Sequence, residues 1–165
     1  MELRKGIMIV TVFLALTLAL SSAAALAAGQ ELLVVANKPT FQAAQKWVDF
    51  LTTKGITVKH VEPSQFGANK GAPYMVVMGG VAEPGMGDLI KEAVGAQEFA
   101  SLGKAGAGKM YTRSNVWGQG QNVLVFAGSD PEAAAKARAD ARDEWMGMLA
   151  DWFGLELGGP TMHGY

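Results

Sequence analysis

The chain contains no cysteine, and it has only two histidines among its 165 residues. The absence of cysteine excludes disulfides, thiol catalysis and cysteine-ligated zinc, so the fold must depend on the burial of apolar side chains. The charges nearly cancel, with 14 Lys and Arg against 15 Asp and Glu, and this balance argues against a nucleic-acid partner. No Asn-x-Ser/Thr acceptor occurs, so N-glycosylation is not expected.

The first thirty residues have the three-part pattern of a secretory signal peptide. Basic residues at Arg4 and Lys5 are followed by an uncharged apolar stretch from Gly6 to Leu20. Ala25-Leu26-Ala27 then matches the small-residue rule of signal peptidase. We therefore predict a signal peptide over residues 1–27 and an exported protein, which is extracytoplasmic because it is secreted, periplasmic or at the cell surface.

Two other interpretations of this segment stay open. Residues 6–28 carry no charge, and a stretch of roughly 20 apolar residues is long enough to span a bilayer as an uncleaved anchor. A pilin-type leader cut after Lys5-Gly6 would instead leave the apolar segment on the mature protein. Contact with a membrane is expected only through this segment, if it is not cleaved.

Five segments have the patterns of β-strands. Three short apolar runs, 31–36, 74–78 and 122–127, predict strands buried on both faces. Two alternating runs, 57–61 and 109–116, predict strands with a solvent-facing side, and 57–61 is expected near an edge of the sheet. Residues 64–73, which are rich in Gly, Asn, Lys and Pro, predict a loop.

Helices are predicted between these strands. Thr40 is expected to cap a helix that ends at Gly55, and short helices are expected over 88–94 and 97–102. Ser129 is expected to cap the last helix, with Pro131 in its first turn and Glu132 closing a capping box, and that helix is expected to run to about Phe153.

The order of these segments predicts an α/β fold in a single domain over residues 28–154. We expect a mostly parallel central sheet of about five strands with helices packed on it, because buried apolar strands alternate with amphipathic helices. Residues 155–165 lack any periodic pattern and are expected to form a flexible C-terminal tail.

Two motifs suggest chemistry but are incomplete. Residues 103–109 match the spacing of a phosphate-binding loop, but Met110 replaces the hydroxyl that would hold Mg²⁺, and the predicted order of helix, loop and strand is the reverse of that motif. A flexible glycine loop is therefore expected, with neither a nucleotide partner nor a cofactor. His60, Glu62 and His163 are the weak metal-ligand candidates, since a structural site needs about four ligands.

The strand ends are the expected position of any ligand site. In open parallel sheets, ligands bind outside the carboxyl ends of the strands. Those ends carry six small or polar residues here: Asn37, Lys38, Gly79, Gly80, Gly128 and Ser129. No catalytic residues are predicted, because Ser129 is already explained as a helix cap and no convergent acid, base and nucleophile are recognisable.

Part of the chain resembles an α/β domain of archaeal S-layer and related cell-surface proteins. The resemblance rests on Val76–Gly80, on Asn115-Val116-Trp117-Gly118, and on the strand Asn122–Ala127 that leads through Gly128 into an Ala-rich helix. It covers about residues 74–141. The resemblance implies a cell-surface location and no catalytic residues.

The sequence therefore predicts a non-enzymatic exported module, at the cell surface or in the periplasm, that acts by contact with another surface protein or envelope component. The alternative is a small-molecule-binding protein or a hydrolase that uses the loops at the carboxyl ends of the strands.

Overall fold

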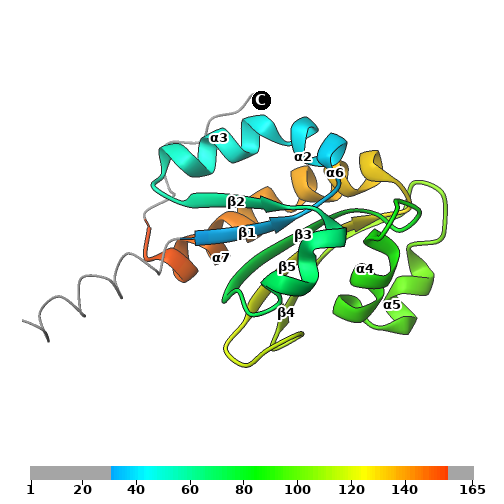
Figure 1. The fold of residues 1–165 in the computed structure, drawn as a ribbon. Helices are drawn as coiled ribbons and strands as arrows, with labels where there is room; N and C mark the ends of the chain where they lie inside the picture. The colour runs from blue at the N-terminus through cyan, green and yellow to red at the C-terminus, as the bar shows by residue number, and fades with distance from the viewer. Residues whose placement is uncertain (1–30, 156–165) are drawn as a thin grey trace, which may run out of the picture. The chain divides into compact units, whose positions relative to one another are not determined.

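Five strands form one sheet in the computed structural model, which describes residues 31–155 (Figure 1). The strands are β1 (Glu31–Val35), β2 (Thr57–Val61), β3 (Tyr74–Gly80), β4 (Gly108–Ser114) and β5 (Asn122–Gly128), in the order β2-β1-β3-β5-β4. Four strands are parallel, and β4 runs antiparallel to β5 at one edge. This confirms the mostly parallel α/β sheet. The predicted signal peptide and most of the predicted tail lie outside the described residues.

Helices cover both faces of the sheet, because alternate side chains of the central strands point to opposite sides. One face is covered by α2 (Lys38–Ala43), α3 (Gln45–Thr53), α6 (Pro131–Asp140) and α7 (Arg142–Phe153). The other is covered by α4 (Met86–Val94), α5 (Ala96–Ser101) and a 3-10 helix over Pro63–Asn69. Leu32 and Val34 belong to the first core, whereas Leu33 and Val35 belong to the second.

Two predicted helices are each divided in two. The helix predicted from Thr40 begins earlier, after Asn37, and breaks at Ala44, while Gly55 follows its end with a φ of 85°. The helix predicted from Ser129 to Phe153 breaks at Ala141. Both breaks fall on alanine, which favours helix. The prediction of continuous helices was therefore wrong at residues whose type indicates no break.

The predicted loop over residues 64–73 contains the 3-10 helix Pro63–Asn69, which buries Phe66 in the second core. Phe66 packs edge-on against Trp117, with 4.7 Å between the ring centroids. The prediction of a loop missed this anchor because the segment is short and rich in glycine and polar residues. Within residues 31–155, no helix is long and apolar enough to cross a membrane.

Candidate functional site

The turns that follow β1, β3 and β5 lie side by side at the carboxyl ends of these strands, as the parallel topology requires. The register places Gly80 directly opposite Gly128. Asn37 follows β1 and is half-buried, whereas Lys38 is exposed on the first turn of α2. The structure thus places the three predicted turns next to one another at the carboxyl ends of the strands. Ligand binding by these turns stays a prediction.

Glu83 links these turns, and the sequence analysis did not identify it. Its carboxylate accepts hydrogen bonds from the Gly80 backbone N–H at 2.6 Å, from the Thr40 hydroxyl at 2.8 Å and from the Asn37 amide at 3.4 Å. Asn37 also donates to the Pro84 carbonyl at 3.2 Å. An acidic residue three positions after a Gly-Gly strand end is the signal that could have indicated it. The carboxylate satisfies the donors that a ligand would otherwise meet between β1 and β3.

The strand-end glycines permit close packing of backbone against backbone. A Cβ on Gly80 would lie 2.6 Å from the Asp130 Cα, and a Cβ on Gly128 would lie 2.4 Å from the Ala134 nitrogen. A Cβ on Gly79 would lie 2.6 Å from the Glu83 Oε2. Gly80 and Gly128 require glycine because the backbone at the N-terminus of α6 occupies the space beside them, whereas at Gly79 the neighbouring atoms belong to side chains that can move.

Asp130, and not Ser129, caps α6. The Asp130 carboxylate accepts from the Ala133 N–H at 2.8 Å, whereas the Ser129 hydroxyl donates to Asp130 at 2.9 Å and accepts from the Gly106 N–H at 3.0 Å. The predicted cap was therefore one residue too early, and the predicted capping box with Glu132 was wrong because Ala133 occupies the third helical position, although Pro131 does begin the helix. The bonds from Ala133 and Ser129 lower the pKa of the Asp130 carboxyl below its usual value.

The metal-ligand candidates do not form a cluster among the described residues. The His60 ring lies 2.9 Å from the Ala36 carbonyl through Nε2 and stacks on Phe41 at 4.0 Å between centroids. Glu62 is half-buried directly after β2, and His163 lies outside the described residues. Within residues 31–155, no group of three or more His, Asp or Glu side chains is placed to hold a metal ion.

The Gly-rich segment over residues 103–107 connects α5 to β4, so the order of helix, loop and strand predicted for it is confirmed. Gly106 has a φ of 72°, which glycine adopts readily. Lys109, which would be the lysine of a phosphate loop, lies on β4 with its ammonium 3.5 Å from the Glu98 carboxylate. The lysine thus faces a helix side chain.

The outer edge of β4 carries backbone groups that have no neighbouring strand. Hydrogen bonds from Ser129 to the Ala107 carbonyl and from Asn115 to the Gln121 carbonyl show that odd-numbered residues form the hydrogen-bonded pairs with β5. Because these pairs alternate in an antiparallel ladder, even-numbered residues direct their N–H and C=O groups outward. We define the outer edge of β4 as the backbone groups of its even-numbered residues: Gly108, Met110, Thr112 and Ser114.

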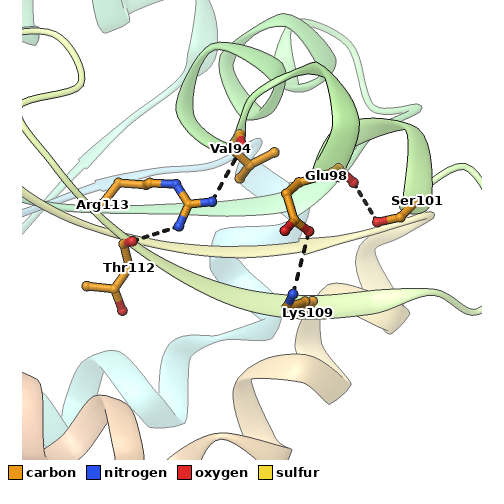
Figure 2. Close-up of polar contacts among 6 residues, drawn as sticks. All are labelled: Val94, Glu98, Ser101, Lys109, Thr112 and Arg113. Carbon is orange, nitrogen blue, oxygen red and sulfur yellow. Dashed lines mark hydrogen bonds and ion pairs between the residues drawn. The ribbon is translucent and has the colours of Figure 1, made fainter.

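Two cations lie along this edge (Figure 2). The Lys109 ammonium lies 5.0 Å, and the Arg113 guanidinium 5.4 Å, from the centre of the Tyr111 ring. Arg113 also donates to the Thr112 carbonyl at 2.9 Å and to the Val94 carbonyl at 3.5 Å. Burial raises the pKa of the Tyr111 hydroxyl above its usual value. The edge therefore carries two cations beside a buried aromatic ring, and one of them, Lys109, is paired with Glu98.

Comparison of the chain with protein-family models, curated proteins and solved structures found no match.

The two regions differ in the chemistry that their geometry permits. At the strand ends, Ser129 contacts Asp130, and His60, the one histidine among residues 31–155, contacts Ala36 instead. The Asp130 carboxylate that accepts from Ser129 is also held as the cap of α6, and no histidine in the described part of the chain lies beside this serine to activate it as in a catalytic triad. The outer edge of β4, by contrast, presents a row of exposed or half-buried positions whose backbone groups have no neighbouring strand among residues 31–155, although the Thr112 carbonyl accepts from Arg113. This row favours binding over covalent chemistry.

Proposed function

We propose that this protein is a non-enzymatic exported module that binds another surface or envelope protein through the outer edge of β4. The observation that carries the proposal is the alternation in β4, which directs the backbone groups of four residues away from β5. An exposed sheet edge of this kind accepts an additional strand, with main-chain hydrogen bonds supplying the affinity and side chains the specificity.

Exposure and length support this surface. Gly108, Thr112 and Ser114 are exposed, and Met110 is half-buried. The strand spans seven residues, which is longer than a typical strand of five to six. Proteins commonly shield such edges with proline, bulges, a covering element or charged side chains. Among these devices β4 carries the charges of Lys109 and Arg113, which disfavour a partner strand without acidic residues.

The charged side chains of β4 favour an acidic partner segment. Lys109 and Arg113 lie on the same face of β4, two residues on either side of Tyr111, so an acidic extended segment would find a cation at both positions. A second copy of this chain would meet repulsion instead. Antiparallel pairing over the full strand would place Lys109 of each copy opposite Arg113 of the other, and like charges directly opposite are destabilising.

The compartment belongs to the same proposal. The predicted signal peptide over residues 1–27 supports export, and the resemblance of residues 74–141 to an α/β domain of archaeal cell-surface proteins supports a surface location. Envelope and cell-surface proteins are then the available partners. N-terminal sequencing of the exported protein tests this part separately, with a start at Ala28 expected and a start before Leu20 contradicting it.

Peptide titration tests the binding surface. The probes are two blocked seven-residue peptides, one alternating threonine with glutamate and one alternating threonine with lysine, titrated into the full-length protein and followed by NMR. Two exposed ion pairs contribute about 0.2–1 kcal/mol each, so the glutamate peptide should bind roughly two- to thirty-fold more tightly. Equal affinity for both peptides, or no binding of either, contradicts the proposal.

Variants locate the binding to the edge. Thr112→Pro removes one outward N–H without removing a bond to β5, and it should abolish binding of the glutamate peptide. The double variant Lys109→Glu and Arg113→Glu should invert the preference toward the lysine peptide, so the proposal stays testable if the proline variant folds poorly. Lys59→Gln removes one charge on β2, at the opposite edge, and should leave the preference unchanged.

A further inference from the structure

A small pocket lies between α2–α3 and α6, on the face of the sheet opposite α4 and α5. Its volume is about 40 Å³. The floor consists of the side chains of Met78 and Phe126, and the walls include Ala44, Ala134 and Arg138. Pro131 and Ala135 are exposed at its rim, so the pocket is accessible from solvent. It is separate from the outer edge of β4.

Arg138 is the one charged side chain that lines this pocket, and it is half-buried. Its guanidinium lies 5.3 Å from the centre of the Trp47 ring, and Nη1 lies 3.9 Å from the Met78 sulfur. In the described part of the chain, no carboxylate lies within ion-pair distance of it. Burial lowers the pKa of the guanidinium, although an arginine remains charged at neutral pH.

The environment of Arg138 leaves most of its hydrogen-bonding capacity unused. A guanidinium has five N–H donors in a planar fork that matches a carboxylate. Among residues 31–155, the one hydrogen bond that the guanidinium donates goes to a sulfur, which is a weak acceptor. A half-buried cation without a counter-ion beside an apolar pocket is therefore complementary to a ligand that is anionic at one end and apolar at the other.

We propose that this pocket binds the carboxylate of a small organic acid, with Arg138 holding the carboxylate and Met78 and Phe126 contacting the apolar body. A buried water needs roughly 10–15 Å³ of such space, so the pocket accommodates about three atoms of that size. Acetate, with four non-hydrogen atoms, comes close to this size, whereas propionate, with five, reaches the exposed rim. The exposed rim at Pro131 and Ala135 lets a longer acid extend into solvent.

The pocket is also distinct from the turn held by Glu83. Thr40 lies between them, since it lines the pocket while its hydroxyl donates to Glu83. Arg138 lies on α6 two turns after the helix start, so the capping carboxylate of Asp130 does not neutralise it within ion-pair distance. Arg138 is therefore not a member of the Glu83 network, which consists of Asn37, Thr40 and Gly80.

Matched ligands test the proposal on the full-length protein. Propionate, its neutral isostere propionamide and propylammonium are titrated at constant ionic strength and followed by NMR of the Arg138 side chain and the Ala134 and Ala135 amides. We expect saturable shifts with propionate, on the order of 1 mM for a ligand of so few atoms. Propionamide should bind at least about tenfold more weakly, because charge-assisted bonds are the stronger ones.

Two variants separate the pocket from general anion binding. Arg138→Gln should weaken propionate binding at least about tenfold. Ala135→Leu fills the exposed rim while retaining the arginine, and it should produce the same loss even if Arg138→Gln folds poorly. Lys136→Gln, an exposed charge on the same helix, should bind like the unmodified protein.

Three results would overturn the proposal. These are equal shifts with propionate and propionamide, unchanged propionate binding in both pocket variants, and equal saturation by chloride, which has no apolar body. None of these results bears on the acidic peptide at β4, because the two surfaces share no residue.

Discussion

The carboxyl ends of the strands and the outer edge of β4 both lie at the boundary of the same sheet. They differ in whether their polar groups have hydrogen-bond partners within the protein. At the strand ends, the Glu83 carboxylate accepts from Gly80, Thr40 and Asn37. Along β4, the outward backbone groups lack a neighbouring strand among residues 31–155. The sheet topology alone predicts a binding site at the carboxyl ends of the strands. The hydrogen-bond partners instead favour the outer edge of β4.

Gly128→Ala should have the largest effect on stability, because it tests whether the strand ends are filled. Its Cβ would lie 2.4 Å from the Ala134 nitrogen, a backbone atom that cannot rotate away. Overpacking of this kind costs about 1–3 kcal/mol, and we expect the upper part of that range in the free energy of unfolding, measured with urea.

Gly147→Ala is the matched control for that variant. No atom lies within 4 Å of its added Cβ, and the residue is inside α7. Alanine favours a helix interior over glycine by about 1 kcal/mol, so this variant should be as stable as the unmodified protein or more so. A Gly128→Ala protein with unchanged stability would mean that space remains beside β5 for a ligand.

Glu83→Ala should have the next largest effect, since it leaves the Gly80 N–H and the Thr40 hydroxyl without their acceptor. An unsatisfied buried polar group costs about 1–3 kcal/mol, and both donors here are partly buried, so a loss of about 1–2 kcal/mol is expected in urea unfolding. Glu83→Gln retains one acceptor oxygen and should lose less. If the two variants were equally destabilised, the hydrogen bonds to the carboxylate would not be the cause.

Asp130 should make stability depend on pH in the acidic range. The hydrogen bonds from Ala133 and Ser129 lower its pKa in the folded state. Because the pKa is lowered, the ionised carboxylate stabilises the folded protein. This stabilisation is complete when the pH is above the pKa of the unfolded state, about 3.9, and it is lost as the pH falls through the lower pKa of the folded state. Asp130→Asn keeps a capping side chain without the titrating group.

The melting temperature of Asp130→Asn should therefore converge with that of the unmodified protein as the pH is lowered from about 6 to about 2. Thermal unfolding followed by circular dichroism over this range measures the convergence. A constant difference between the two proteins at every pH would show that the charge of Asp130 does not stabilise α6.

Lys109→Gln should have the smallest effect on folding. Its ion pair with Glu98 is exposed, and such pairs contribute about 0–1 kcal/mol. We expect a change in unfolding free energy within about 0.5 kcal/mol, together with a weaker preference for the glutamate peptide. A large loss of stability would mean that this side chain serves the fold and not a partner.

The sequence predicted the strands well because apolar runs such as Val123–Ala127 have few structural alternatives. It predicted the helix breaks poorly, since Ala44 and Ala141, where the helices are interrupted, are residues that favour helix. The three strand-end turns were located correctly along one margin. Glu83 was missed because its importance depends on Thr40 and Asn37, which are distant in sequence.

The outer edge of β4 was recognisable only in part. The alternation of charged and apolar residues predicted a solvent-facing strand at 109–116. It could not predict that this strand lies at the edge of the sheet and pairs antiparallel with β5, because both depend on contacts between segments distant in sequence. The Arg138 pocket was not recognisable at all. It forms where small residues of α2 and α6 meet over Met78, and neither helix alone carries that information.

Residue-resolved amide hydrogen exchange along β4 tests the central claim most directly. In the free protein, the amides of Met110, Thr112 and Ser114 should exchange rapidly and those of Tyr111 and Arg113 slowly, because the latter bond to β5. Addition of the alternating threonine–glutamate peptide should protect the first three. Slow exchange at all these positions in the free protein, or no added protection with the peptide, would contradict the account.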